Sequence, residues 1–323
     1  METDTQREAM EYDVVIVGAG PSGLATAIKL KQINADANVC IVEKASEVGA
    51  HILSGNVFET KALDELLPDW QSMEGCPLKT KVSKEKFLVL SEKSYFSVPS
   101  FLLPPVQHNK GNYITSLANL CRWLGQVAEG MGVEIYPGFA ASEILYDEQG
   151  KVRGVATNDM GLDINNEKKD SYEPGIELHA KVTVFAEGCR GHLGKQLINK
   201  FNLSENSDPQ QYGIGLKEIW EVPEENHDEG MVLHSVGWPL ENDTYGGSFV
   251  YHAENKQIYL GYVIGLDYSN PYLSPFEEFQ RFKTHPAIKK MLSGGKRISY
   301  GARALIEGGL QSLPKMYMPG ALL

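Results

Sequence analysis

The sequence predicts an α/β (α+β) protein in which a Rossmann-type nucleotide-binding domain carries an inserted antiparallel-sheet domain. Two observations support this. Near the N-terminus, the apolar, β-branched run 12–17 is followed at once by the glycine pattern of residues 18–23 and then by a segment with helical spacing. Beyond residue 205, short strand patterns follow one another without the long helices that must join parallel strands.

The glycine pattern predicts a dinucleotide site. Gly18 allows a tight turn out of the strand, Gly20 lets the backbone approach a pyrophosphate, and Gly23 lets the helix pack closely on the strand. The helix that begins at this point offers free N–H groups and a positive dipole end. Glu43 ends the next strand pattern, 20 residues after Gly23, where a carboxylate can accept hydrogen bonds from ribose and repels a 2′-phosphate. The pattern does not decide between FAD and NAD, and a glycine turn that serves packing only is the alternative.

The remaining patterns give the order of the elements. A loop with small turn-forming residues spans 44–56, a proline-rich stretch spans 75–112, and a helix is predicted over 114–130. An exposed hairpin tip is predicted at 165–172, and the segment 297–305 is interpreted as a strand that returns to the nucleotide-binding part. The predicted strands of the first domain are 38–43, 133–136, 141–146, 152–158 and 182–185, and those of the second are 213–221, 232–236, 247–252 and 258–264, followed by helical pieces at 275–282 and 287–292.

Composition narrows the possible partners. The chain of 323 residues is 42% hydrophobic, as expected of a folded protein, and its net charge of -12 argues against nucleic-acid binding. The four cysteines lie far apart without a zinc-binding spacing, which favours buried thiols in a reducing compartment. No uninterrupted apolar stretch is long enough to span a bilayer, and the polar first eleven residues carry no pattern of a signal or transit peptide.

Several unusual strings carry a family resemblance. They occur in family order along nearly the whole chain: EKASEVGAHILSG (43–55), GNYI (111–114), ATNDMG (156–161), FAEGCRGHL (185–193), GWPL (237–240), TYGGSF (244–249), GLDYSNPYLSP (265–275) and GGKRISYGARA (294–304). With these strings the sequence closely resembles the electron transfer flavoprotein-ubiquinone oxidoreductases, membrane-associated flavoenzymes that pass electrons from electron transfer flavoprotein to the quinone pool.

The resemblance implies a flavoprotein of the glutathione reductase and hydroxylase type with FAD in the Rossmann site. The loop 51–55 would then lie near the flavin ring. The implied FAD contacts are Gly18, Gly20, Pro21, Ser22, Gly23, Glu43, Lys44, His51, Ser54, Gly55 and Gly188.

The resemblance also implies a ubiquinone pocket at Tyr245, Gly246 and Gly247, where backbone approaches the quinone head group. Fixed N–H donors can stabilise a carbonyl oxygen that gains negative charge, and glycine allows close approach. The alternative is that Gly246 and Gly247 only begin a strand beside a bulge.

The run 96–106 is too short and too rich in proline to span a bilayer as a helix. In a soluble protein it would be a buried loop, but the family's quinone is confined to the membrane. We therefore expect monotopic membrane contact through Phe101, Leu102 and Leu103. The implied location is the cytoplasmic face of a bacterial inner membrane, or the mitochondrial inner membrane in a eukaryote.

The sequence departs from the family at its end. Family members continue into a segment that closes the FAD site and then into a domain with a [4Fe-4S] cluster, whose four-cysteine motif this chain does not contain. We therefore expect a truncated member in which the FAD-binding domain is incomplete at the C-terminus. The expected FAD-binding domain comprises 12–75, 112–205 and 298–323, and the ubiquinone and membrane-contact domain comprises 76–111 and 206–297.

The expected function is that of an oxidoreductase which accepts electrons from reduced electron transfer flavoprotein and delivers them through FAD to ubiquinone. No residue is predicted to act as a strong general base, and no metal site is predicted within this chain. One alternative is a geranylgeranyl reductase-like or hydroxylase-like FAD enzyme that uses NAD(P)H, and another is an inactive fragment. We expect Asp159, Glu187 and Arg303 to order loops rather than contact FAD.

Overall fold

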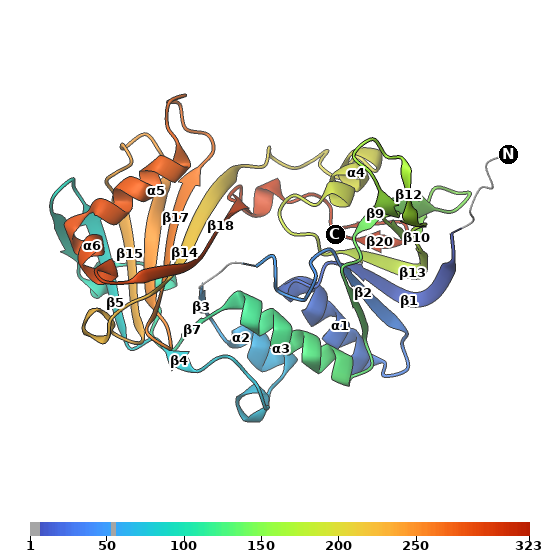
Figure 1. Cartoon of the computed structure of the whole chain (residues 1–323), viewed down its shortest axis with the longest axis horizontal. Coiled ribbons are helices and arrows are strands. Elements are labelled where there is room, and N and C mark those ends of the chain that lie inside the picture. Colours follow the sequence, from blue (N-terminus) through green and yellow to red (C-terminus); the bar gives the residue numbers. More distant parts are fainter. Residues whose placement is uncertain (1–6, 53–55) are drawn as a thin grey trace. The chain divides into compact units, whose positions relative to one another are not determined.

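The computed structural model describes residues 7–52 and 56–323, which divide into two units (Figure 1). Unit 1 comprises Met1–His51, Cys121–Asp208 and Leu313–Leu323, and unit 2 comprises Ile52–Leu120 and Pro209–Ser312. Each unit has its own sheets and its own buried core, so each is described by itself.

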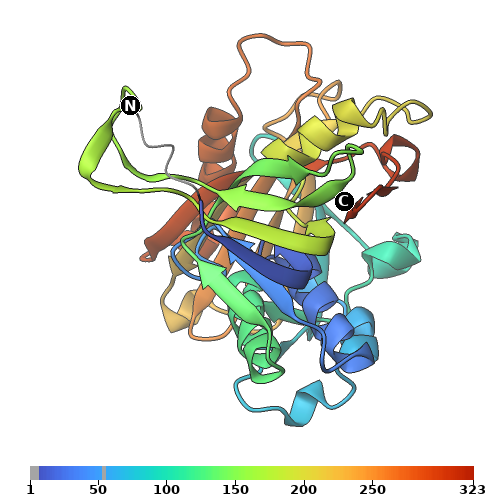
Figure 2. The ribbon, with the colours of Figure 1, turned by 90° about the vertical axis from the view of Figure 1, so that its right-hand side faces the viewer.

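Unit 1 is built on an eight-stranded sheet whose central strands are parallel. The order runs β19-β20-β13-β1-β2-β8, and Figure 2 shows β13, β1, β2 and β8 side by side. The end of β1 and most of β2 are apolar and largely buried, because both faces of a parallel sheet are covered there. In register, Val17 at the end of β1 lies between Val42 and Phe185. The bounds are β1 (Ala9–Val17), β2 (Val39–Glu43), β8 (Glu134–Pro137), β13 (Glu177–Phe185), β19 (Tyr317–Met318) and β20 (Ala321–Leu322).

An antiparallel flank completes this sheet. Strand β10 (Val152–Thr157) pairs with the first half of β13 and with β9 (Ala141–Tyr146), while β20 runs parallel to the second half of β13. A separate hairpin of β11 (Met160–Leu162) and β12 (Lys168–Glu173) forms the exposed tip that the sequence predicts.

Three helices of the chain carry side chains into the core of unit 1. Helix α1 (Pro21–Ile33) packs on β1 and β2 through a face that includes Leu24, Ala27 and Ile28. Helix α4 (His192–Lys200) buries Leu193 and Leu197 in the core cluster. Helix α3 (Leu117–Gly130) begins three residues later than predicted, because Tyr113–Thr115 forms strand β7.

Unit 2 is built on a seven-stranded sheet of order β18-β14-β17-β16-β15-β5-β6. The bounds are β5 (Lys84–Leu90), β6 (Tyr95–Val98), β14 (Tyr212–Glu221), β15 (Met231–Gly237), β16 (Gly246–His252), β17 (Gln257–Gly265) and β18 (Lys296–Ile306). All neighbours pair antiparallel except β5 and β15, which are parallel. The four strands predicted between residues 213 and 264 are confirmed.

The two faces of the seven-stranded sheet are covered differently. Helices α5 (Pro275–Thr284) and α6 (Pro286–Leu292) cover one face, where Phe279, Phe282 and Ile288 join alternate residues of the strands (Figure 1). On the other face, a smaller apolar cluster includes Ile114 and Tyr251. Ile114 belongs to a three-stranded sheet of β3 (Asn56–Phe58), β7 and β4 (Thr80–Lys81). Short segments complete the unit: α2 (Lys61–Leu66), η1 (Trp70–Ser72), η2 (Ser100–Leu102), η3 (Pro105–Gln107), η4 (Glu224–Asn226) and η5 (Leu310–Ser312).

One interpretation of the sequence is wrong. The segment 297–305 forms a strand as predicted, but β18 does not return to the nucleotide-binding sheet. It pairs along its length with β14, from Glu221↔Lys296 to Tyr212↔Ile306, and so forms an edge of the sheet of unit 2. Within the described residues, no helix is long and apolar enough to cross a membrane.

Candidate functional site

The carboxyl ends of three parallel strands meet at one edge of unit 1. The amide of Gly18, just after β1, donates to the carbonyl of Val42 in β2 at 2.8 Å. The amide of Ala186, just after β13, donates to the carbonyl of Val17 at 2.9 Å. The loops that carry Gly18, Glu43 and Gly188 are therefore held together, at the edge where ligands bind in open α/β sheets.

The structure gives a steric reason for two of the three glycines of the loop and leaves the space beside the third open. Gly18 has φ +106, and a Cβ there would lie 2.6 Å from the carbonyl oxygen of Ala186. A Cβ on Gly23 would lie 2.1 Å from the carbonyl oxygen of Gly18, so this glycine lets α1 pack against the loop. A Cβ on Gly20 would meet no atom of the described residues within 4 Å. As far as these residues show, the space beside Gly20 is open, which fits a phosphate group close to the backbone.

The N-terminus of α1 faces this space without a side-chain cap. Its N-cap is Gly20, Pro21 occupies the first turn, and no acidic residue lies in that turn. Proline at the start of a helix has no amide to satisfy, and the next amides and the helix dipole favour an anion. These residues fit the pyrophosphate of a dinucleotide.

Glu43 lies beside the loop and is held by it. One carboxylate oxygen accepts from the amide of Ala19 at 2.9 Å, and the other accepts from the amide of Ala45 at 2.8 Å. A carboxylate oxygen has more than one lone-pair site, so both oxygens can still accept a hydrogen bond from a ribose hydroxyl. Glu43 thus also fixes the glycine loop, a role that the sequence pattern did not reveal.

Glu187 caps the second helix near this edge. Its carboxylate accepts from the amides of Gly194 at 2.7 Å and Leu193 at 3.3 Å, so the N-terminus of α4 already holds a negative charge. Asp159 accepts from the amide of Gly175 at 2.8 Å, which is the main cause of its lowered pKa. Asp159 therefore holds a loop and Glu187 holds a helix N-terminus, while the expectation that neither contacts FAD stays a prediction.

The other expected FAD contacts have less distinctive surroundings. Pro21, Ser22, Lys44 and His51 are exposed. Gly188 is exposed with φ +81, and a Cβ there would meet no atom within 4 Å. The predicted contacts Ser54 and Gly55 lie outside the described residues.

In unit 2, Tyr245 is exposed and its carbonyl accepts from the amide of Gly265 at 2.9 Å. Gly246 and Gly247 begin β16. A Cβ on Gly246 would lie 2.5 Å from the carbonyl oxygen of Val263, and one on Gly247 would lie 2.9 Å from that of Ser235. Close packing within the sheet is thus sufficient to explain why both positions are glycine. Contact between these glycines and a ligand therefore stays a prediction.

The segment predicted to contact a membrane forms two short 3₁₀ turns after β6. Phe101 is 82% exposed and Leu102 is 64% exposed, while Leu103 is half-buried. Phe96 and Val106 are exposed as well. A soluble protein rarely displays large apolar side chains together, so this surface favours the membrane interpretation over a buried loop.

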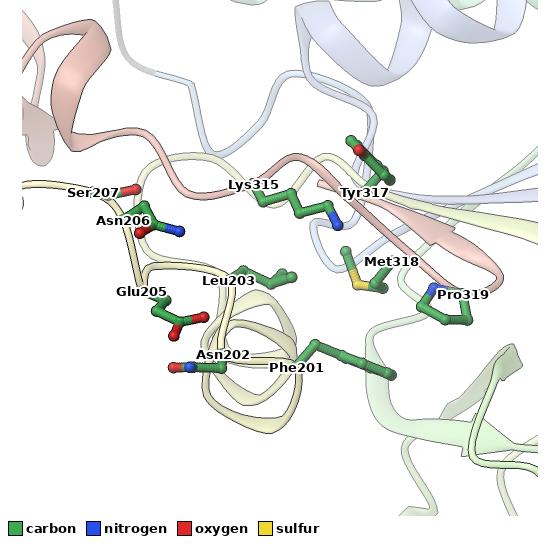
Figure 3. A pocket seen from close by; sticks show the side chains of 10 residues that line it. All are labelled: Phe201, Asn202, Leu203, Glu205, Asn206, Ser207, Lys315, Tyr317, Met318 and Pro319. Atoms are coloured by element: carbon green, nitrogen blue, oxygen red, sulfur yellow. The ribbon is translucent and has the colours of Figure 1, made fainter.

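A pocket of unit 1 lies between the turn after α4 and the segment that carries Lys315 and Tyr317 (Figure 3). Leu203 and Met318 contribute apolar surface, and Glu205 contributes a carboxylate. None of the expected nucleotide contacts in the described part of the chain lines this pocket, which is therefore separate from the glycine loop.

The parallel sheet and the open glycine loop define a dinucleotide-binding protein of the Rossmann class with a second, mainly antiparallel unit. Family models agree: residues 16–67 match an NAD(P)-binding Rossmann-like domain, and residues 212–305 match the domain described as ETF-QO, ubiquinone-binding. An electron transfer flavoprotein-ubiquinone oxidoreductase of Pseudomonas aeruginosa is 59% identical over 98% of this chain. Mitochondrial proteins of the same name from Dictyostelium discoideum and Sus scrofa are 54% and 55% identical over 98% of it. Over nearly its whole length the chain is thus similar to the electron transfer flavoprotein-ubiquinone oxidoreductases.

The chain spans 59% of the Pseudomonas relative and 52% of the two mitochondrial ones. Among solved structures, a geranylgeranyl bacteriochlorophyll reductase-like protein of Thermoplasma acidophilum has a TM-score of 0.69 at 16% identity, covering 97% of this chain and 70% of that one. A flavoprotein/dehydrogenase of Cytophaga hutchinsonii has a TM-score of 0.64 at 18% identity, with the same coverage. These likenesses confirm the predicted fold class.

Proposed function

We propose that unit 1 binds FAD and that the protein passes electrons from electron transfer flavoprotein through this flavin to ubiquinone. The observation that carries the FAD assignment is the uncapped start of α1 beside the open space at Gly20, with Glu43 fixed at the end of the next strand. Gly20 and the first amides of α1 would hold the pyrophosphate, and Glu43 would hold the ribose. When bound, the flavin supplies a group that takes up electrons and passes them on.

The proposed electron donor and acceptor rest on the similarity to these relatives. The relatives are named for electron transfer flavoprotein and ubiquinone, and a ubiquinone-binding model matches most of the large sheet of unit 2. In our proposal Tyr245, Gly246 and Gly247 approach the quinone head group through backbone. Lys44, His51, Ser54, Gly55 and Gly188 remain proposed FAD contacts.

Membrane association is part of the same proposal, because ubiquinone is confined to the bilayer. The exposed apolar surface formed by Phe96, Phe101, Leu102 and Val106 would enter one leaflet without spanning it. The corresponding location is the bacterial inner membrane, at its cytoplasmic face, or the mitochondrial inner membrane.

A second candidate is a reductase that takes hydride from NAD(P)H, as the fold shared with the Thermoplasma protein allows.

The test of the proposed function uses FAD-loaded protein whose flavin has been photoreduced without oxygen. We expect a short-tailed ubiquinone analogue to restore the oxidised flavin spectrum within seconds. Gly247→Val should slow this reoxidation and leave the flavin content intact. Lys296→Met, at an exposed lysine of β18 in the same sheet, is the control. Failure of the analogue to reoxidise the flavin of the unmodified protein would refute the proposal.

A further inference from the structure

A row of side chains crosses the face of the large sheet opposite α5 and α6. Cross-strand pairing places Lys217 beside Gly261, Gly261 beside Phe249, and Phe249 beside His234. Leu216, Val250 and Leu260, which alternate with these residues, belong to the core under the helices. Because successive side chains of a strand point to opposite faces, Lys217, Phe249 and His234 share the other face.

Lys217 has unusual surroundings for a lysine. Its direct neighbours on both adjacent strands are glycines, Gly261 and Gly301, so neither contributes a side chain. Its ammonium lies 5.6 Å from the centre of the Phe249 ring, which itself covers Gly261. The side chain is half-buried, and among the described residues no carboxylate lies within ion-pair distance of it.

On the opposite face of the same strand, a buried charge is compensated by ion pairs, as is usual in proteins. Glu218, which is 2% exposed, forms ion pairs with Lys283 at 2.9 Å and Arg297 at 3.0 Å. A partly buried charge is normally matched in this way, because desolvation without a partner is costly. Lys217 is thus a desolvated cation whose counter-charge is not supplied by the described protein.

The proposed quinone position at Gly247 lies on the same face of the sheet. It belongs to the neighbouring row of cross-strand pairs, two residues along the strands from the row of Lys217. Gly247 pairs with Val263, and Val263 pairs with Gly215, two residues before Lys217. With strands about 4.8 Å apart and about 3.3 Å per residue, the Cα atoms of Lys217 and Gly247 are roughly 12 Å apart. The four-carbon stem of lysine covers part of this distance, so a six-membered ring placed over Val263 would bring one carbonyl oxygen towards each of the two residues.

We propose that Lys217 is the proton donor to a carbonyl oxygen of the quinone bound at Gly247, an inference that rests on the proposed function. Reduction of a quinone adds two electrons and two protons, one proton to each carbonyl oxygen. The electrons are those that the proposed function delivers. One proton leaves Nζ of Lys217 as the new O–H bond forms, water supplies the other, and water then returns the proton to the amine. While charged, Lys217 also stabilises the negative charge that develops on the oxygen.

Burial lowers the pKa of the Lys217 amine, which makes its ammonium a stronger acid. The titratable or charged groups of the same face are Glu221 on β14, Lys296 and Arg303 on β18, Tyr259 on β17, Tyr251 on β16, His234 on β15 and Glu85 on β5. Nε2 of His234 is already hydrogen-bonded to the hydroxyl of Tyr251 at 2.8 Å, and burial lowers the pKa of His234. Lys217 is therefore the better placed donor.

The test compares Lys217→Met and Lys217→Arg with the unmodified protein, all loaded with FAD and photoreduced. Reoxidation by a short-tailed ubiquinone analogue should be about 100-fold slower in Lys217→Met, as for loss of a general acid. Lys217→Arg keeps the charge but has no accessible proton to give, so it should also be slow. Reoxidation by ferricyanide, which takes up no proton, should be unchanged. Lys296→Met, at an exposed lysine of β18, is the matched control and should behave as the unmodified protein.

Two further measurements distinguish proton donation by Lys217 from a role of this residue in packing alone. The reoxidation rate of the unmodified protein should fall as pH rises through the pKa of Lys217, and this fall should vanish in Lys217→Arg. Labelling of Lys217 by an amine-directed reagent, measured by peptide mass spectrometry, should be reduced by the ubiquinone analogue. If the unmodified protein reacts with the analogue while Lys217→Met stays within threefold of it, or if the analogue does not protect Lys217, this inference is wrong although the proposed function stands. No reaction of the unmodified protein would instead overturn the proposed function.

Discussion

Substitutions at two glycines of the loop should affect FAD binding and protein stability separately. We predict that Gly20→Ala weakens FAD binding without unfolding the protein, whereas Gly23→Ala destabilises the protein itself. Gly20 has φ -79 and ψ 179, a conformation open to any residue, and a Cβ there meets nothing within 4 Å. The free energy of unfolding of the FAD-free Gly20→Ala protein should stay within about 1 kcal/mol of the unmodified value.

The added methyl group of Gly20→Ala would instead occupy the place of the pyrophosphate. Loss of one hydrogen bond to a charged phosphate costs about 1.5–3 kcal/mol, which corresponds to roughly a 10- to 100-fold higher Kd for FAD. In Gly23→Ala, the Cβ would lie 2.1 Å from the carbonyl oxygen of Gly18 and 3.2 Å from Cγ2 of Ile16. Such overpacking lowers the free energy of unfolding by about 1–3 kcal/mol.

Urea unfolding of the FAD-free proteins and titration of FAD by flavin fluorescence measure the two effects separately. Equal destabilisation of Gly20→Ala and Gly23→Ala would refute the distinction between the two glycines. Unchanged FAD affinity in Gly20→Ala would refute the placement of the pyrophosphate.

Three further predictions concern other parts of the chain. Glu187→Ala removes the cap of α4 and should lower the free energy of unfolding by about 1 kcal/mol in urea, with Glu205→Ala as a control; no change would contradict the capping role. Burial lowers the pKa of His252 to about 4, so the unfolded protein binds more protons below about pH 6.5. Stability should therefore fall by up to about 3 kcal/mol as pH drops from about 6.5 to 4, and His252→Gln should lose this component of the pH dependence. Replacing Phe101 and Leu102 by serine should weaken sedimentation with lipid vesicles at least tenfold, because each inserted side chain contributes about 1.5–3 kcal/mol; undiminished binding would exclude this surface as the membrane contact.

Local patterns predicted most of the fold. The buried run before Gly18, the alternation of the strands between residues 213 and 264, and the helical spacing after Pro21 all reflect short-range periodicity, and the structure confirms each. The steric roles of Gly18 and Gly23 also follow from local geometry, whereas contact between Gly20 and a pyrophosphate stays a prediction.

The errors concern partners that lie far away in sequence. The strand at residues 297–305 was assigned to the wrong sheet, because strand periodicity does not reveal which neighbour the strand pairs with. The parallel pairing of β5 with β15, two segments separated by more than a hundred residues, left no pattern to detect. Lys217 was missed for the same reason: its glycine neighbours lie on β17 and β18, and only the register brings them together.

We propose that this protein gives its electrons to a quinone rather than taking hydride from a nicotinamide. The most direct measurement follows the flavin absorbance of the FAD-loaded protein without oxygen, first after addition of NADPH and then, after photoreduction, on addition of a ubiquinone analogue. We predict no bleaching by NADPH and rapid return of the oxidised spectrum with the analogue. Rapid bleaching by NADPH together with no response to the analogue would contradict the account.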